Sequence, residues 1–159
     1  MPKVVIIGYG NPLRGDDGVG WVVAKELQEL LISDAITIKT CIQLTPELAA
    51  DLCDAEIAIL IDARAGEPAG AVFCEQVEPL PALPSSSHHF APAALLSYAH
   101  HFFGKAPRTY LVSVNGAEFG YQEHLSPPVR KAIPKVVKFI CSLIEQFVAE
   151  QCQPYGKPM

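Results

Sequence analysis

Two adjacent carboxylates directly follow a glycine-rich turn near the start of the chain. An apolar run, Val4 to Ile7, is typical of a strand and leads into the sequence GYGNPLRGDDGVG, residues 8 to 20. A phosphate-binding loop has lysine and then serine or threonine where this chain has Asp16 and Asp17. Carboxylates at the start of a helix suit the helix dipole, but they repel phosphate and attract a cation. The loop is therefore predicted to face a metal ion.

Two other interpretations of this loop compete with a metal site. A dinucleotide-binding fingerprint would begin at Gly8 and Gly10, but its third glycine falls on Leu13, and no acidic residue ends the second strand. Alternatively, Asp16 could cap the helix that begins near Gly18, an ordinary role worth about 1 kcal/mol. One cap needs only one side chain, so this role leaves Asp17 and the many glycines unexplained.

A second carboxylate and a histidine are predicted to reach the same edge of the sheet. Asp62 ends the apolar run Ile57 to Ile61, and the loop carrying His88 and His89 leads into a helix. Ligands of open parallel sheets bind beyond the carboxyl ends of the strands. Two carboxylates and one imidazole suit zinc, nickel, manganese or iron better than calcium or magnesium. Three protein ligands leave positions open for water or substrate, which favours chemistry over a structural role.

The elements that must position these groups alternate between strand and helix patterns. This alternation predicts an α/β fold with a twisted, mostly parallel sheet of about five strands and helices on both faces. A continuous apolar run over 57–61 indicates a central strand that stops at Asp62, and Pro134 is expected to separate a short turn from the last helix. Expected strands are 4–7, 35–41, 56–62, 71–77 (antiparallel, at an edge) and 110–114; expected helices are 18–31, 45–53, 92–103 and 134–149.

Size and composition limit the classes of function. A chain of 159 residues is long enough for one domain, placed at 1–150, with a flexible tail over 151–159. The net charge of −5 disfavours nucleic acid as a partner, and the sequence has neither an uninterrupted apolar run that could span a membrane nor a secretory signal. We therefore expect a cytoplasmic protein without a membrane partner. Its cysteines are expected to be free thiols: Cys41, Cys53, Cys74, Cys141 and Cys152.

Three segments together resemble the hydrogenase maturation endopeptidases. They are residues 8–20, the strand end ILIDA over 59–63, and SHHFAP over 87–92. The likeness extends from Lys3 to about Phe147, and its first motif is fairly specific. The form SHHFAP further resembles the group that serves bidirectional NAD-reducing hydrogenases.

This resemblance implies a compact α/β endopeptidase that removes a C-terminal extension from a [NiFe]-hydrogenase large-subunit precursor after nickel insertion. It implies that Asp17, Asp62 and His89 contact the metal, with His88 as the alternative histidine. The nickel would be carried by the substrate, although another divalent transition metal is compatible with the ligands. Asn11 and the backbone N–H groups near Gly10 are further hypothesised to stabilise the oxyanion. A non-catalytic nickel-binding checkpoint protein for the large subunit is the alternative function.

Overall fold

A five-stranded sheet forms the centre of the computed structural model, which describes residues 1–84 and 90–151. Its strand order is β2-β1-β3-β5-β4, with β4 antiparallel to β5 and every other pair parallel. The predicted fold class and the antiparallel edge strand are therefore confirmed. The strands are β1 (Val4–Tyr9), β2 (Ile36–Cys41), β3 (Ile57–Ala65), β4 (Val72–Val77) and β5 (Arg108–Gly116).

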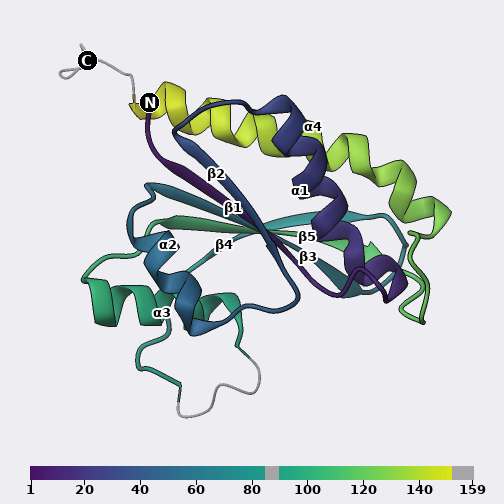
Figure 1. Ribbon diagram of the computed structural model, residues 1–159, viewed down its shortest axis with the longest axis horizontal. Helices are drawn as coiled ribbons and strands as arrows, with labels where there is room; N and C mark the ends of the chain where they lie inside the picture. The colour runs from purple at the N-terminus through teal and green to yellow at the C-terminus, as the bar shows by residue number, and fades with distance from the viewer. Residues whose placement is uncertain (85–89, 152–159) are drawn as a thin grey trace.

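Helices cover both faces of this sheet (Figure 1). The α-helices are α1 (Val19–Leu30), α2 (Ala49–Cys53), α3 (Pro92–Phe103) and α4 (Pro127–Gln151), with short 3-10 turns at η1 (Gly15–Gly18) and η2 (Pro46–Leu48). In Figure 1, α1 and α4 lie together on one side and α2 and α3 on the other. The alternating side chains of the strands therefore pack into two separate hydrophobic cores.

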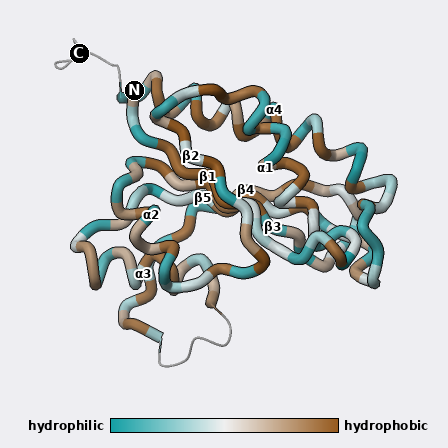
Figure 2. Tube along the Cα trace, viewed as in Figure 1, coloured by the Kyte–Doolittle hydropathy of each residue, from teal (hydrophilic) through white to brown (hydrophobic). Residues whose placement is uncertain are grey.

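The central strand β3 contributes to both cores. Ile57, Ile59 and Ile61 face α1 and α4, whereas Ala58 and Leu60 face α2 and α3, and all five are fully buried. Figure 2 shows the strands crossing the middle of the molecule as its most hydrophobic part. Burial on both faces explains the continuous apolar run, because a parallel strand between two helical layers has no solvated side.

The predicted boundaries of β3 and of the last helix were wrong, and β1 and β5 extend up to two residues beyond their predicted ends. Strand β3 does not stop at Asp62 but continues to Ala65, because its ladder with β5 extends to the pair Ala65 and Gly116. Pro134 does not interrupt the last helix, which runs unbroken from Pro127 to Gln151. Proline removes one helical hydrogen bond, and the buried side chains before and after it hold the helix against the sheet: Val129, Ala132, Ile133, Val136, Val137, Ile140, Ile144 and Phe147.

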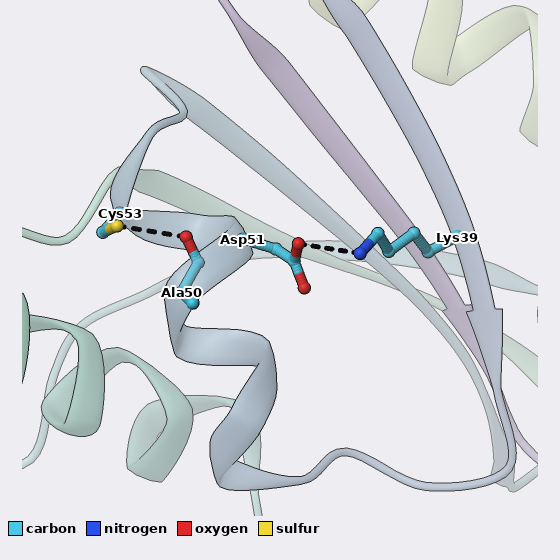
Figure 3. Close-up of polar contacts among 4 residues, drawn as sticks. All are labelled: Lys39, Ala50, Asp51 and Cys53. Atoms are coloured by element: carbon cyan, nitrogen blue, oxygen red, sulfur yellow. Dashed lines mark hydrogen bonds and ion pairs between the residues drawn. The ribbon is translucent and has the colours of Figure 1, made fainter.

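The outer strand β2 is tied to α2 by an ion pair. Lys39 Nζ lies 2.7 Å from Asp51 Oδ1, and Figure 3 shows the lysine reaching from the strand to the helix. In the same view the Cys53 thiol donates to the Ala50 carbonyl within α2. The thiols of Cys41, Cys53, Cys74 and Cys141 are free, as predicted.

None of the helices in the described ranges is long and apolar enough to cross a membrane. Gln151, the first residue of the predicted tail, is the last residue of α4, whereas 152–159, including the fifth cysteine Cys152, lie outside the described residues.

Candidate active site

The candidate site lies where the strand order reverses. Strand β2 lies on one side of β1, whereas β3 and then β5 lie on the other side. The carboxyl ends of β1 and β3 are therefore neighbours with loops that leave in opposite directions, which is where ligands bind in open α/β sheets. Tyr9 is the last residue of β1, and Asp62 lies just beyond the end of the β1 to β3 ladder.

Glycines allow the first loop and α1 to pack directly on these strands. A Cβ atom at Gly8 would overlap the Gly20 carbonyl oxygen, and one at Gly20 would lie 2.6 Å from the Ile61 carbonyl oxygen. Gly10 has a φ of 136° and stands against the backbone of Asp17. Close backbone approach thus explains the glycine pattern that superficially resembles a phosphate loop.

Asp17 is held by the loop that carries it. Its Oδ2 accepts a hydrogen bond of 2.7 Å from the Asn11 backbone N–H. The Asn11 Oδ1 in turn accepts from the Leu13 N–H at 2.9 Å, which closes an Asx turn. Trp21 Nε1 donates to the Gly10 carbonyl at 2.8 Å and to the Cys41 carbonyl at 3.1 Å. The Asp17 carboxylate is therefore fixed before any ligand arrives.

Asp62 has a pKa well above that of an ordinary carboxyl. Burial raises the pKa of Asp62 to about 6, and the negative charge of Asp17 acts in the same direction. Hydrogen bonds from the Ala63 N–H, at 2.7 Å, and from the Tyr9 hydroxyl oppose this rise. The pKa of Tyr9 is raised as well, first by burial and then by the charge of Asp62. The charge of Asp17 thus acts on Asp62, and the charge of Asp62 acts on Tyr9.

Both carboxylates line one pocket of about 370 Å³. The predicted convergence of Asp17 and Asp62 is therefore observed. Its lining consists of Tyr9, Gly10, Asp17, Ile42, Gln43, Leu44, Asp62, Phe90, Ala91 and Pro92. His88 and His89, the candidate third ligands, lie outside the described residues, and the next residue in sequence, Phe90, belongs to the pocket wall. Among the described residues alone, no group of three potential ligands gathers around one point.

Asp16 has a different role from either of those considered for it. It is completely buried and does not cap a helix; its carboxylate accepts from three backbone N–H groups at 2.7 to 3.0 Å and from one hydroxyl. These donors belong to Ala117, Glu118 and Ser126, between β5 and α4. Asp16 therefore ties the first loop to the segment that follows β5. Its carboxylate accepts hydrogen bonds from these donors and does not serve as a metal ligand.

The environment of Asp16 keeps it ionised. Burial by itself would raise the pKa of this carboxyl, but the hydrogen bonds from Glu118, Ser126 and Ala117 outweigh burial and lower the pKa below its ordinary value. Charged acceptors make hydrogen bonds about twice as strong as neutral ones do. The hydrogen bonds that join Asp16 to the segment after β5 are consequently stronger at neutral pH than in acid.

The hypothesis about oxyanion stabilisers needs a correction. The Gly10 N–H already donates to the Cys41 carbonyl at 3.1 Å, and the Asn11 N–H donates to Asp17. These backbone groups are therefore not available to a substrate. The side-chain amide of Asn11 differs, because its Nδ2 donates to none of the residues that the structure describes, while its oxygen is fixed by the Asx turn.

Comparison of the chain with protein-family models and with curated proteins finds no match. Solved structures do match. The hydrogenase maturating endopeptidase HybD from E. coli has a TM-score of 0.76 and 23% identity, covering 91% of this chain and 93% of HybD. The [NiFe] hydrogenase maturation protease HycI from Thermococcus kodakarensis has a TM-score of 0.73 and 23% identity, with the same coverage of each chain, 91% and 93%. This chain has the fold of the hydrogenase maturation endopeptidases.

A third structure extends this likeness. The hydrogenase 2 maturation peptidase from a Thaumarchaeota archaeon matches with a TM-score of 0.68 and 22% identity, covering 89% of this chain and 97% of that chain. The resemblance inferred from three short motifs is thus confirmed at the level of the fold, over nearly the whole chain.

Sequence reasoning missed one residue of the site. Tyr9 lines the pocket, and its hydroxyl helps to lower the pKa of Asp62, but no motif of the sequence assigns it a role. The available signal was its position at the end of the first strand, next to the carboxyl end of β3. A polar side chain at the reversal point of a sheet is a candidate for ligand contact on this ground alone.

Proposed function

We propose that this protein is an endopeptidase that removes a C-terminal extension from a [NiFe]-hydrogenase large-subunit precursor after nickel has been inserted. The observation that carries the proposal is the convergence of Asp17 and Asp62 in one pocket at the reversal point of the sheet. The fold shared with hydrogenase maturation endopeptidases supports the same conclusion.

The pocket suits a nickel ion that arrives with the substrate. Two carboxylates whose charges disfavour one another are stabilised when a cation lies between them. Burial is the main cause of the raised pKa of Asp62, and the negative charge of Asp17 adds to it. Asp17 and Asp62 are oxygen ligands, and His89 would supply nitrogen, a set that suits a first-row transition metal. Nickel is here the recognition signal of the precursor, and the docked metal places the scissile bond beside the carboxylates.

The chemistry required is the attack of a water molecule on the scissile carbonyl. A carboxylate of the site would accept the proton of this water molecule. The Asn11 side-chain amide is the candidate donor to the developing oxyanion, because its fixed oxygen leaves Nδ2 directed away from the Asx turn. The form of the segment 87–92 supports a bidirectional NAD-reducing hydrogenase as the source of the precursor.

The test compares nickel-loaded with nickel-free precursor, with mass spectrometry of the precursor's C-terminus as the readout. Loss of the extension only from the nickel-loaded form is expected. Equal cleavage of both forms would contradict nickel recognition. Binding of the loaded precursor with an intact C-terminus would instead support a checkpoint protein that does not cut.

Single replacements of Asp17, Asp62 and His89 with Ala are expected to abolish processing while the circular dichroism spectrum stays native. Tyr9→Phe serves as a graded variant, because it removes only the hydroxyl that helps to lower the pKa of Asp62. Processing retained in all three Ala variants would exclude this site.

A further inference from the structure

Arg64 lies on the same strand and the same face as Asp62. Residues two apart in a strand share a face, so Asp62 and Arg64 both project on the side covered by α2 and α3. In the ladder between β3 and β5, Asp62 is opposite Ser113, and Arg64 is opposite Asn115. The arginine therefore begins about 7 Å further along the strand than the acid.

The Arg64 side chain extends across β5 to the edge strand. Its guanidinium lies 4.6 Å from the centroid of the Phe73 ring, and Phe73 is on β4, opposite Ser113. Strand β5 separates β3 from β4, so the guanidinium must pass over β5 and come back toward the row that contains Asp62. Phe73 thus holds the guanidinium over this face of the sheet.

Arg64 is exposed and has no acidic partner within 4 Å among the described residues, unlike another arginine on the same sheet. Arg108 also lies over an aromatic ring, that of Phe147, but its Nη1 is 3.2 Å from Glu150. A cation over a ring contributes about 0.5 to 1 kcal/mol at an exposed site. That contact stabilises the arginine's position and leaves its charge and its donors unused.

We propose that Arg64 binds a carboxylate of the substrate's C-terminal extension. This inference rests on the proposed function. A C-terminal peptide always carries at least one carboxylate. The planar pairs of N–H groups of a guanidinium match a carboxylate with two parallel hydrogen bonds. Arg64 accordingly determines specificity and orients the extension, while the site acids act on the scissile bond.

The sheet sets the position of this carboxylate. Asp62 and Phe73 lie in one row, two strands apart, which corresponds to about 10 Å. An extended peptide covers about 3.3 Å per residue. The carboxylate that Arg64 binds is therefore expected roughly two to four residues after the scissile bond.

The first measurement is processing of the nickel-loaded precursor by Arg64→Ala, with Arg108→Ala as the matched control. Arg64→Ala is expected to raise KM roughly 10- to 100-fold with kcat changed less than about twofold, because a charge-assisted pair is lost from binding alone. The KM of Arg64→Lys should lie between those of the wild type and Arg64→Ala, since lysine keeps the charge without the bidentate geometry. An unchanged KM for Arg64→Ala would overturn the inference, and a wild type that cleaves nothing would overturn the proposed function instead.

The second measurement is independent of cleavage. Fluorescence anisotropy follows binding of a labelled synthetic extension peptide to the wild type and to Arg64→Ala. Three forms are compared: the free acid, the C-terminal amide, and the peptide with Gln or Asn at each acidic side chain. If the C-terminal amide binds weakly and equally to both proteins, Arg64 binds the terminal carboxylate. If the peptide with Gln or Asn does so, Arg64 binds a side-chain carboxylate. Equal binding of the free acid by both proteins would overturn the inference.

Discussion

Replacing Asp62 with Asn is expected to stabilise the protein at pH 8. The pKa of this carboxyl rises from 3.8 to about 6 in the folded state, chiefly through burial. A shift of about 2 units corresponds to about 3 kcal/mol at most, because each unit is worth about 1.4 kcal/mol. Asn keeps an oxygen for the Tyr9 and Ala63 donors, but these bonds become weaker, by about 1 kcal/mol together. The free energy of unfolding should therefore increase by about 1 to 2 kcal/mol.

The pH dependence of this gain has a definite sign. A folded-state pKa above the unfolded value makes the protonated form favourable to folding, so the wild type loses stability as the pH rises through about 6. The advantage of Asp62→Asn should be full above pH 7 and vanish as the pH falls to about 4. Processing activity should be lost in the same variant.

Urea denaturation at pH 8, 6 and 4 measures the difference, with the exposed Asp34→Asn as a control that should behave as the wild type. A variant no more stable than the wild type at pH 8, or a gain independent of pH, would refute the reasoning. A stabilised but inactive enzyme would mark Asp62 as a residue kept for function at a cost in stability.

Three further predictions concern the framework of the site. Asp16→Ala should lower the free energy of unfolding by about 3 to 5 kcal/mol in urea titrations at pH 7, because buried donors lose their acceptor. Since the pKa of Asp16 is lowered, this difference from the wild type should shrink as the pH falls below the ordinary carboxyl range. Gly10→Ala should destabilise by more than about 2 kcal/mol in thermal denaturation and impair processing, whereas Gly120→Ala, with open space around it, should do neither. Lys39→Met should change stability by less than about 1 kcal/mol in a urea titration, because the ion pair with Asp51 is partly solvated.

The sequence was sufficient to predict the convergence of Asp17 and Asp62. Both follow runs of apolar residues that could only be central strands, and parallel strands bring their carboxyl ends to one edge. The edge strand β4 was predictable for a related reason, since its polar residues exclude burial on both faces. These features depend on local periodicity and on a rule of topology that applies to most α/β sheets.

The role of Asp16 could not be predicted in this way. Its partners lie 101 to 110 residues away in the sequence, and no local pattern around Ala117 or Ser126 marks them as donors. The effect of Pro134 was wrongly predicted for the opposite reason. Its local penalty is real, but packing of the helix against α1 and the sheet outweighs it, and that packing is a property of the complete fold.

The tie between Asp16 and the segment before α4 has a consequence during synthesis of the chain. The carboxylate leaves the ribosome early, whereas its donors at Ala117, Glu118 and Ser126 emerge only after most of the polypeptide has been made. A nascent chain shorter than this cannot fix the glycine-rich loop on the strands, and so it cannot present Asp17 in its final position. The site would thus form only when translation is nearly complete.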